Sequence, residues 1–153
     1  MPIGKLLKSV AGSAIVLGFG VSLAYASADD AIKGRQNCMK NGNGAMMGVM
    51  VPMIKGEKPY DAAAVTAALA LDGENCAGWA TWWGADTQKG ETLKTRAKPE
   101  IWTDAAGFEA AAGAYVAAVT ALGATNDEAG FKAAFPALGA ACQGCHEKFR
   151  GPE

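Results

Sequence analysis

Apolar residues recur along most of this chain at spacings of three and four, a period that predicts amphipathic helices rather than strands. Four alanine-rich segments carry the pattern. The inward rows of the first two segments are Ile32, Arg35, Met39, Gly42, Met46, Val49 and Met53, then Val65, Leu69, Asp72, Cys76, Trp79 and Trp83. The inward rows of the last two are Ile101, Ala105, Phe108, Ala112, Tyr115, Val119 and Leu122, then Phe131, Phe135, Leu138, Cys142, Cys145 and Phe149.

Capping residues and the positions of Gly and Pro give the expected helix boundaries. The first helix should end at the turn Lys55-Gly56-Glu57-Lys58-Pro59, because Gly and Pro interrupt the helical pattern there. Asp61 can cap the second helix with its carboxylate. Residues 84–98 are expected to form a loop, and Pro99 suits the first turn of a third helix.

The end of the chain carries a fourth helix, with Asn126 as its expected cap and Gly151-Pro152 as its end. Pro52 and Pro136 fall inside predicted helices and should bend them locally without ending them. Short connections join the first helix to the second and the third to the fourth, so each pair should be antiparallel. We therefore expect an all-α fold, an antiparallel up-down-up-down four-helix bundle.

Residues 1–26 have the order of a secretory signal peptide. Two lysines precede an uncharged apolar run from Val10 to Leu23, and small residues follow it, so we expect cleavage after Ala26 or Ala28. A membrane anchor is the alternative, but a run of about 14 residues is short for a bilayer that needs roughly 20. The prediction is one mature domain, residues 27–153, in the periplasm and off the membrane after cleavage.

The charge of the chain excludes one class of partner and suggests another. The full sequence has 14 basic and 15 acidic residues, and removing Lys5 and Lys8 leaves 12 against 15, a net charge of −3. A nucleic-acid binder would need a basic face to neutralise phosphates, which this composition does not supply. A partner that docks electrostatically should therefore present a basic patch.

The residues Cys142-Gln143-Gly144-Cys145-His146 form a C-x-x-C-H motif, the attachment signature of c-type haem. On a helix, two thiols three residues apart lie on one face, where each can form a thioether with one haem vinyl group. The next residue then places an imidazole under the iron. The motif predicts one covalent haem c, with Cys142 and Cys145 as attachment points and His146 as an iron ligand.

Other chemistries fit these residues less well. A thioredoxin-like C-x-x-C belongs beside a βαβ unit, which the pattern does not contain, and a zinc site needs four tetrahedral ligands, awkward for the adjacent pair Cys145 and His146. His146 is the single histidine of the chain, so a Ser-His-Asp or Cys-His arrangement, or a distal acid–base pair, has no second imidazole. We therefore expect no enzymatic activity.

A haem would also explain two unusual features of the predicted core. Rows with so many alanines and glycines would leave the bundle underpacked, and Arg35 on the inward row would be a buried cation without a partner. A porphyrin fills the volume, and its propionates can pair with the guanidinium. The alternative is that Arg35 lies near a helix end and reaches water.

The position of residues along the bundle also indicates which methionine could be the second axial ligand. His146 lies about 6 Å from the end of the last helix, and the antiparallel first helix begins at that same end of the bundle. Met39 lies about 13 Å from its helix start, within reach, whereas Met46 at about 24 Å is too far, as are Met47 and Met50. Core filling is the alternative role for such a methionine.

Taken together, several motifs make the chain resemble the cytochrome c-prime family, the class II c-type cytochromes. They are the C-x-x-C-H motif in the last helix, Arg35-Gln36-x-x-Met39-Lys40, Lys55-Gly56-Glu57-Lys58-Pro59-Tyr60-Asp61 and Lys98-Pro99-Glu100-Ile101-Trp102. The similarity spans residues 30–150. It implies a periplasmic four-helix bundle, frequent homodimers and one covalent haem.

The resemblance also implies roles for individual residues. Arg35 and Gln36 would lie near a propionate, and Arg150 beside the proximal face of the haem. The family has a five-coordinate branch that binds nitric oxide or carbon monoxide and a six-coordinate low-spin branch with a methionine ligand. The residue four after the first-helix arginine distinguishes them, and Met39 at that place indicates the low-spin branch.

We therefore expect a single-electron carrier with His146 and Met39 as axial ligands and periplasmic redox proteins as partners. The alternative is a five-coordinate protein that binds nitric oxide or carbon monoxide. His/Met ligation raises the reduction potential relative to histidine alone, because the thioether favours ferrous iron.

Cys38 and Cys76 are two further cysteines that do not belong to the family motifs. Each lies 19 residues from Glu57, so on antiparallel helices both sit at the same level, about 28 Å from the turn. Facing Cα atoms of packed helices lie roughly 3.4 to 5.4 Å apart, which overlaps the disulfide range. Cys38 is one step off the inward row, so a bridge and two buried thiols both stay open.

Overall fold

The structure is a computed structural model that describes residues 27–152. The predicted signal peptide lies outside the described residues. Within that range the chain is helical, and its single β-type contact is the isolated bridge between Ala97 and Arg150. The expected all-α fold is therefore confirmed.

The first predicted helix is one rod in three consecutive parts. Helix α1 spans Ala28–Asn37, the π-helical segment η1 spans Cys38–Asn43, and α2 spans Gly44–Ile54. Ser27 begins α1 with a capping box, in which its hydroxyl accepts from the Asp30 N–H and the Asp30 carboxylate accepts from the Ser27 N–H. The π-helical segment was not predicted, because a period of 3.6 continues through it.

The second helix is shorter than predicted. Helix α3 spans Ala62–Cys76, and Asp61 caps it as expected, accepting from the Ala64 N–H at 3.0 Å. The expected continuation through Trp79 and Trp83 is wrong. The chain turns at Gly78, where a Cβ would lie 2.6 Å from the ring of Trp82, and the 3₁₀ turns η2 (Trp79–Thr81) and η3 (Ala85–Thr87) follow.

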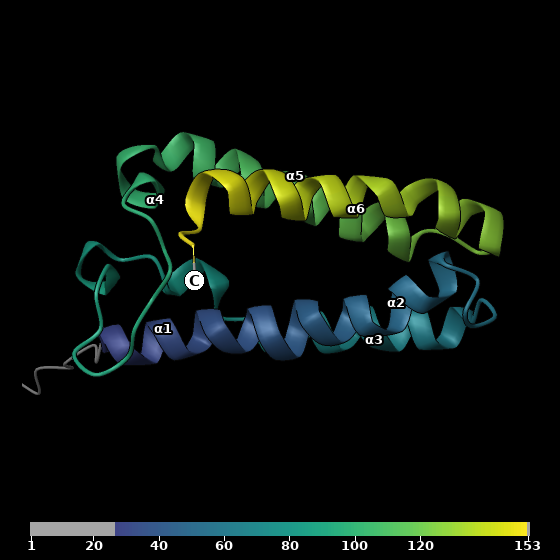
Figure 1. Ribbon diagram of the computed structural model, residues 1–153, viewed down its shortest axis with the longest axis horizontal. Coiled ribbons are helices and arrows are strands. Elements are labelled where there is room, and N and C mark those ends of the chain that lie inside the picture. Colours follow the sequence, from purple (N-terminus) through teal and green to yellow (C-terminus); the bar gives the residue numbers. More distant parts are fainter. Residues whose placement is uncertain (1–26, 153) are drawn as a thin grey trace, which may run out of the picture.

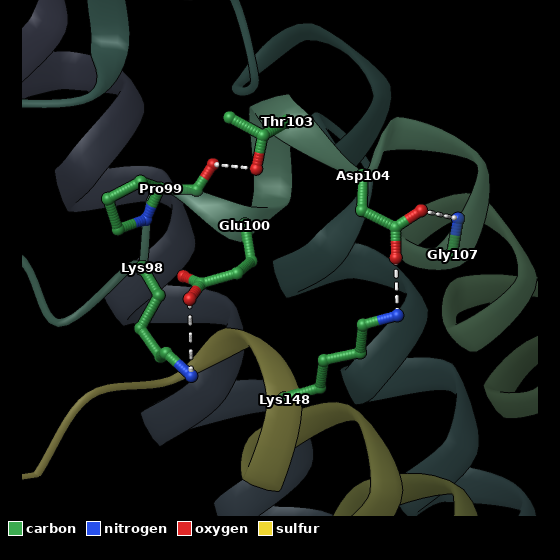
Figure 2. A network of polar contacts seen from close by, with 7 residues as sticks. All are labelled: Lys98, Pro99, Glu100, Thr103, Asp104, Gly107 and Lys148. Atoms are coloured by element: carbon green, nitrogen blue, oxygen red, sulfur yellow. Dashed lines mark hydrogen bonds and ion pairs between the residues drawn. The ribbon is translucent and has the colours of Figure 1, made fainter.

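The third helix is broken near its start. Helix α4 spans Glu100–Thr103, after Pro99, and α5 spans Ala105–Gly123. Asp104 between them has φ −126° and ψ 60°, outside the helical region, and its carboxylate accepts from the Gly107 N–H at 3.1 Å (Figure 2). The break therefore comes from a side-chain cap within the predicted helix.

Helix α6 spans Glu128–Phe149 and carries the C-x-x-C-H motif near its end. Asp127, not Asn126, is its cap: the Asp127 backbone is extended, and the carboxylate accepts from the Gly130 N–H at 2.7 Å. The expectation for Asn126 is thus wrong by one residue. Pro136 lies inside α6 and Pro52 inside α2, and neither ends its helix, as predicted.

The helices form two antiparallel pairs, α1–α2 with α3 and α5 with α6 (Figure 1). The tight apolar core lies between the pairs in the half of the bundle that holds the turns after α2 and α5. Its buried members are Met46, Met50, Met53, Val65, Ala68, Ala118, Leu122, Phe131 and Leu138. Among the described helices, α5 has the length and composition that could cross a membrane, but helices of bundle cores pass the same test.

Candidate functional site

The other half of the bundle contains two cavities that meet at the end of α6. Their volumes are about 480 and 320 Å³, and both are lined by Met39, Trp79, Cys145 and His146. Met39 comes from η1 and His146 from α6, so two elements far apart in sequence contribute to the same walls. Cys142 lines the smaller cavity, one helical turn before His146.

The environment of the C-x-x-C-H side chains favours their neutral forms. Cys142 and Cys145 are half-buried free thiols, and burial raises the pKa of both. Burial, and then the charges of Arg150 and Arg96, lower the pKa of His146 below its usual range. A neutral imidazole keeps a nitrogen lone pair that can ligate a metal.

Arg35 is buried at the wall of the larger cavity, with 5% of its surface exposed. Its Nη2 donates to the Thr87 carbonyl at 2.6 Å, and the guanidinium lies 4.7 Å from the ring centroid of Trp83. Its Nε and Nη1, however, have no hydrogen-bond partner among the described residues. Burial lowers the pKa of Arg35. The alternative that Arg35 reaches water at a helix end is therefore wrong.

Trp83 brings another unsatisfied donor to the same wall. Its Nε1 is buried without a hydrogen-bond partner among the described residues. Buried donors without acceptors cost free energy, about 1–3 kcal/mol each. Together with the Arg35 nitrogens, they fit an anionic group that the protein part of the structure does not provide. Trp83 was placed on the predicted inward row. The sequence could not assign a role to its N–H, because the conformation of the loop decides where that group points.

Gln36 and Arg150 also line the larger cavity. The Gln36 amide donates to the Lys94 carbonyl at 2.8 Å, which joins α1 to the long loop. The Arg150 backbone N–H donates to the His146 carbonyl at 3.1 Å, and the charge of Arg150 contributes to lowering the pKa of His146. Both residues are therefore beside the predicted site.

The smaller cavity contains a polar group that the sequence did not identify as functional. Asp72 is 3% exposed, accepts from the Tyr115 hydroxyl, and accepts from Asn43 Nδ2 at 2.5 Å. Asn43 Nδ2 also lies 2.8 Å from the Tyr115 hydroxyl oxygen. Burial first, and then Asp72, raise the pKa of Tyr115 far above its usual range. The sequence feature that could have identified this site is the position of Asp72, an acidic residue on the predicted apolar row of the second helix.

Cys38 and Cys76 form a disulfide with a Cα–Cα distance of 4.7 Å, so the bridged alternative is the one the structure contains. It joins the start of η1 to the end of α3, close to Met39. In the chain-entropy model, a crosslink of this sequence separation stabilises the fold by about 4 kcal/mol.

The residues present fit a haem. A large, flat apolar group suits two adjoining cavities walled by aromatic and aliphatic side chains, and its carboxylates suit the unsatisfied donors of Arg35 and Trp83. Two free thiols and one imidazole supply the donor set for thioether attachment and iron ligation. Within residues 27–152 no cluster of three or more His, Cys, Asp or Glu could hold a bare metal ion.

Comparison with known proteins agrees with this fit. The family model described as Cytochrome C' matches residues 30–150. Cytochrome c' of Rubrivivax gelatinosus is 42% identical over 106 residues, covering 67% of this chain and 81% of the relative. Cytochrome c-556 of Rhodopseudomonas palustris is 35% identical over 148 residues, covering 94% of this chain and 96% of the relative.

Two solved structures have the same architecture. The crystal structure of Rubrivivax gelatinosus cytochrome c' gives a TM-score of 0.73 at 37% identity, covering 82% of this chain and 98% of that one. A nitric oxide complex of a mutant cytochrome c prime from Alcaligenes xylosoxidans gives a TM-score of 0.71 at 33% identity, covering 84% of this chain and 99% of that one. With the four-helix bundle, the C-x-x-C-H motif and these matches, the chain belongs to the cytochrome c' family, whose members carry one covalent haem c with its iron.

Proposed function

We propose that this protein is a periplasmic one-electron carrier, with its haem attached through Cys142 and Cys145 and with His146 and Met39 as axial ligands. The observation that carries the proposal is that Met39 and His146, from η1 and α6, line the same two cavities. A side chain from each layer can therefore approach one group held between them. The name cytochrome c-556 among the relatives supports this branch.

Haem iron supplies the electron-transfer chemistry by cycling between the ferric and ferrous states. His146 and Met39 would hold the iron from the protein's own side chains, so that no substrate would enter and little structure would rearrange. Cys142 and Cys145 fix the attachment, and the neutral imidazole of His146 offers its lone pair. The thioether of Met39 favours the ferrous state and raises the reduction potential relative to histidine alone.

Arg35 and Trp83 would orient the haem through a propionate. Their unpartnered N–H groups at the wall of the larger cavity would then gain an acceptor, and the buried guanidinium would gain a counter-charge. Gln36 and Arg150 line the same cavity and are proposed as further contacts. The acidic mature chain favours redox partners with a basic patch, and homodimers, which are frequent in the family, are the expected assembly.

The proposal is tested by replacing Met39 with alanine in the haem-loaded protein. The unaltered protein should give a low-spin spectrum with a sulfur-to-iron charge-transfer band. Met39→Ala should give a high-spin spectrum and bind carbon monoxide more than about tenfold faster, because the open state becomes the dominant one. Absorption spectra and stopped-flow mixing with carbon monoxide measure both.

Met47→Ala is the matched control. Met47 is half-buried like Met39 and belongs to the same rod, but it lines neither cavity, so its loss should leave the spectrum low-spin. A high-spin spectrum of the unaltered protein, with immediate uptake of carbon monoxide or nitric oxide, would contradict electron transfer. It would support the second candidate, gas binding, which the nitric oxide complex of the Alcaligenes xylosoxidans relative favours.

A further inference from the structure

The π-helical segment η1, which carries Met39, is held to α3 on both sides of that residue. Before Met39, Asn37 Nδ2 donates to Asn75 Oδ1 at 2.8 Å, and Cys38 is bonded to Cys76. These are consecutive positions on both helices, so the two backbones are fixed in register immediately before Met39. Cys38 is 1% exposed, which places the crosslink inside the bundle.

After Met39, the same two elements are in close contact again. A Cβ at Gly42 would lie 3.0 Å from Asp72 Oδ1 and 3.1 Å from Cys76 Sγ, so glycine allows η1 to approach α3 closely. Asn43 follows, and its Nδ2 donates to Asp72 at 2.5 Å. The part-buried hydrogen bond from the Tyr115 hydroxyl to Asp72 fixes the acceptor for Asn43 from the side of α5.

Met39 also occupies a special place in the backbone. Its carbonyl accepts from the Gly44 N–H, five residues on, which is the hydrogen bond of a π turn. Isolated π turns are rare in helices and occur frequently at functional sites. This one is supported at both ends by contacts with α3, while the Met39 side chain itself lines the two cavities.

We infer that these contacts act as a clamp that positions Met39 as an axial ligand and so decides whether the sixth position is closed. The clamp consists of Asn37, Cys38, Gly42 and Asn43 against Asp72, Asn75 and Cys76. The inference rests on the proposed function, because it assumes that Met39 ligates the iron. A neutral thioether is a weak ligand, so its occupancy depends on how little freedom its backbone has to lose on binding.

The experiment removes the disulfide from the haem-loaded protein. Cys38→Ala with Cys76→Ala leaves Cys142 and Cys145 as the cysteines available for haem. Replacing both cysteines also avoids leaving one of them as an unpaired thiol. The expected result is a mixed-spin ferrous spectrum and about a tenfold faster reaction with carbon monoxide, in proportion to the fraction of open sites. Treating the folded unaltered protein with a phosphine reductant should move the spectrum and the rate in the same direction, without any change of sequence.

Leu122→Ala is the control for a general loss of stability. Leu122 is 1% exposed in the apolar core and lines neither cavity. It should lower the denaturation midpoint but leave the carbon monoxide rate at the unaltered value. Circular dichroism and denaturant titration of all forms show that the comparison is made on folded protein.

The outcomes separate this inference from the proposed function. A high-spin spectrum of the unaltered protein overturns the proposed function and the clamp together. If the unaltered protein is low-spin, but neither the double substitution nor reduction changes the spectrum or the rate, the clamp alone is overturned. An equal acceleration by Leu122→Ala also overturns it, because the effect would then come from global stability.

Discussion

At the scale of single residues, Asp72 places a buried carboxylate beside the proposed haem-attachment residues. It lines the same cavity as Cys142, Cys145 and His146, and its partners are the neutral groups of Tyr115 and Asn43. No lysine or arginine within residues 27–152 forms an ion pair with it. A negative charge here would favour the ferric over the ferrous state of a bound haem.

Replacing Asp72 with asparagine should therefore raise the reduction potential. For charges on the order of 10–15 Å apart at an effective dielectric of about 20, the Coulomb energy is about 1–2 kcal/mol, or several tens of millivolts for one electron. Spectroelectrochemical titration of the loaded protein measures the shift. Tyr115→Phe is the matched control: it removes a donor to the carboxylate but keeps the charge, so it should not raise the potential. An unchanged potential in Asp72→Asn would contradict this role.

The sequence identified residues whose chemistry depends on local spacing, and it missed those that depend on the loop. Cys142, Cys145 and His146 share one helix, so their relation is fixed by sequence distance. Arg35 was recognised because a cation on an apolar row needs a partner. The Trp83 N–H was not, because its direction depends on how residues 77–99 fold back over α1, and no periodic pattern describes that path.

At the scale of elements, the corner between α4 and α5 is tied to the end of α6. Figure 2 shows Asp104 accepting from the Gly107 N–H and paired with Lys148, two residues after His146. The Thr103 hydroxyl donates to the Pro99 carbonyl, and Lys98 lies 3.8 Å from Glu100 in the same corner. Asp104 thus both begins α5 and holds the end of α6 that carries the C-x-x-C-H motif.

This contact predicts a specific dependence of stability on pH. The hydrogen bond and charge of Lys148 lower the pKa of Asp104, so its carboxylate contributes stability above the unfolded value of 3.8, and this is lost as pH falls through the folded pKa. Asp104→Asn keeps a capping side chain but loses the ion pair. Its thermal midpoint should be below that of the unaltered protein at pH 7, and the difference should close in acid.

Glu128→Gln is the control for this prediction. It breaks the ion pair of Glu128 with Lys132, which lies within a single helix and joins no two elements, so its midpoint should change little at any pH. Thermal melts followed by circular dichroism between about pH 2 and pH 7 compare the three forms. A constant difference between Asp104→Asn and the unaltered protein across this range would contradict the assignment.

The elements themselves were predicted well where the apolar period is unbroken and less well at their ends. Asp61 and Asp127 show that an acidic residue ahead of an alanine run caps a helix, although Asn126 was chosen for the last one. The break at Asp104 comes from its local cap on the Gly107 N–H, and α3 ends early where the ring of Trp82 packs against Gly78, four residues before it. Such contacts override a helical pattern that continues through them.

At the scale of the whole molecule, one half of the bundle has a packed core and the other half has cavities. The haem is therefore expected to supply the missing core of that half. Replacing Cys142 and Cys145 together with alanine should yield a protein whose haem is extracted by acid and organic solvent, and whose denaturation midpoint is lower. Extraction followed by absorption of both phases measures attachment.

The double variant Cys38→Ala with Cys76→Ala is the matched control for attachment. It also removes two cysteines, but these form the disulfide and not the C-x-x-C-H motif, so the haem should stay with the polypeptide on extraction. Haem that stays with the Cys142 and Cys145 variant would contradict covalent attachment through these thiols.

The division of the bundle into a packed half and a hollow half also predicts an order of assembly. The turns after α2 and α5 join neighbouring helices at the packed end, so each hairpin can form from contacts that are local in sequence (Figure 1). The C-x-x-C-H motif is in the last described helix, so the ribosome makes it after all the others. An enzyme that attaches the haem would then act on a chain whose helices are already packed at one end of the bundle and not yet at the other. Haem attachment would then complete folding rather than follow it.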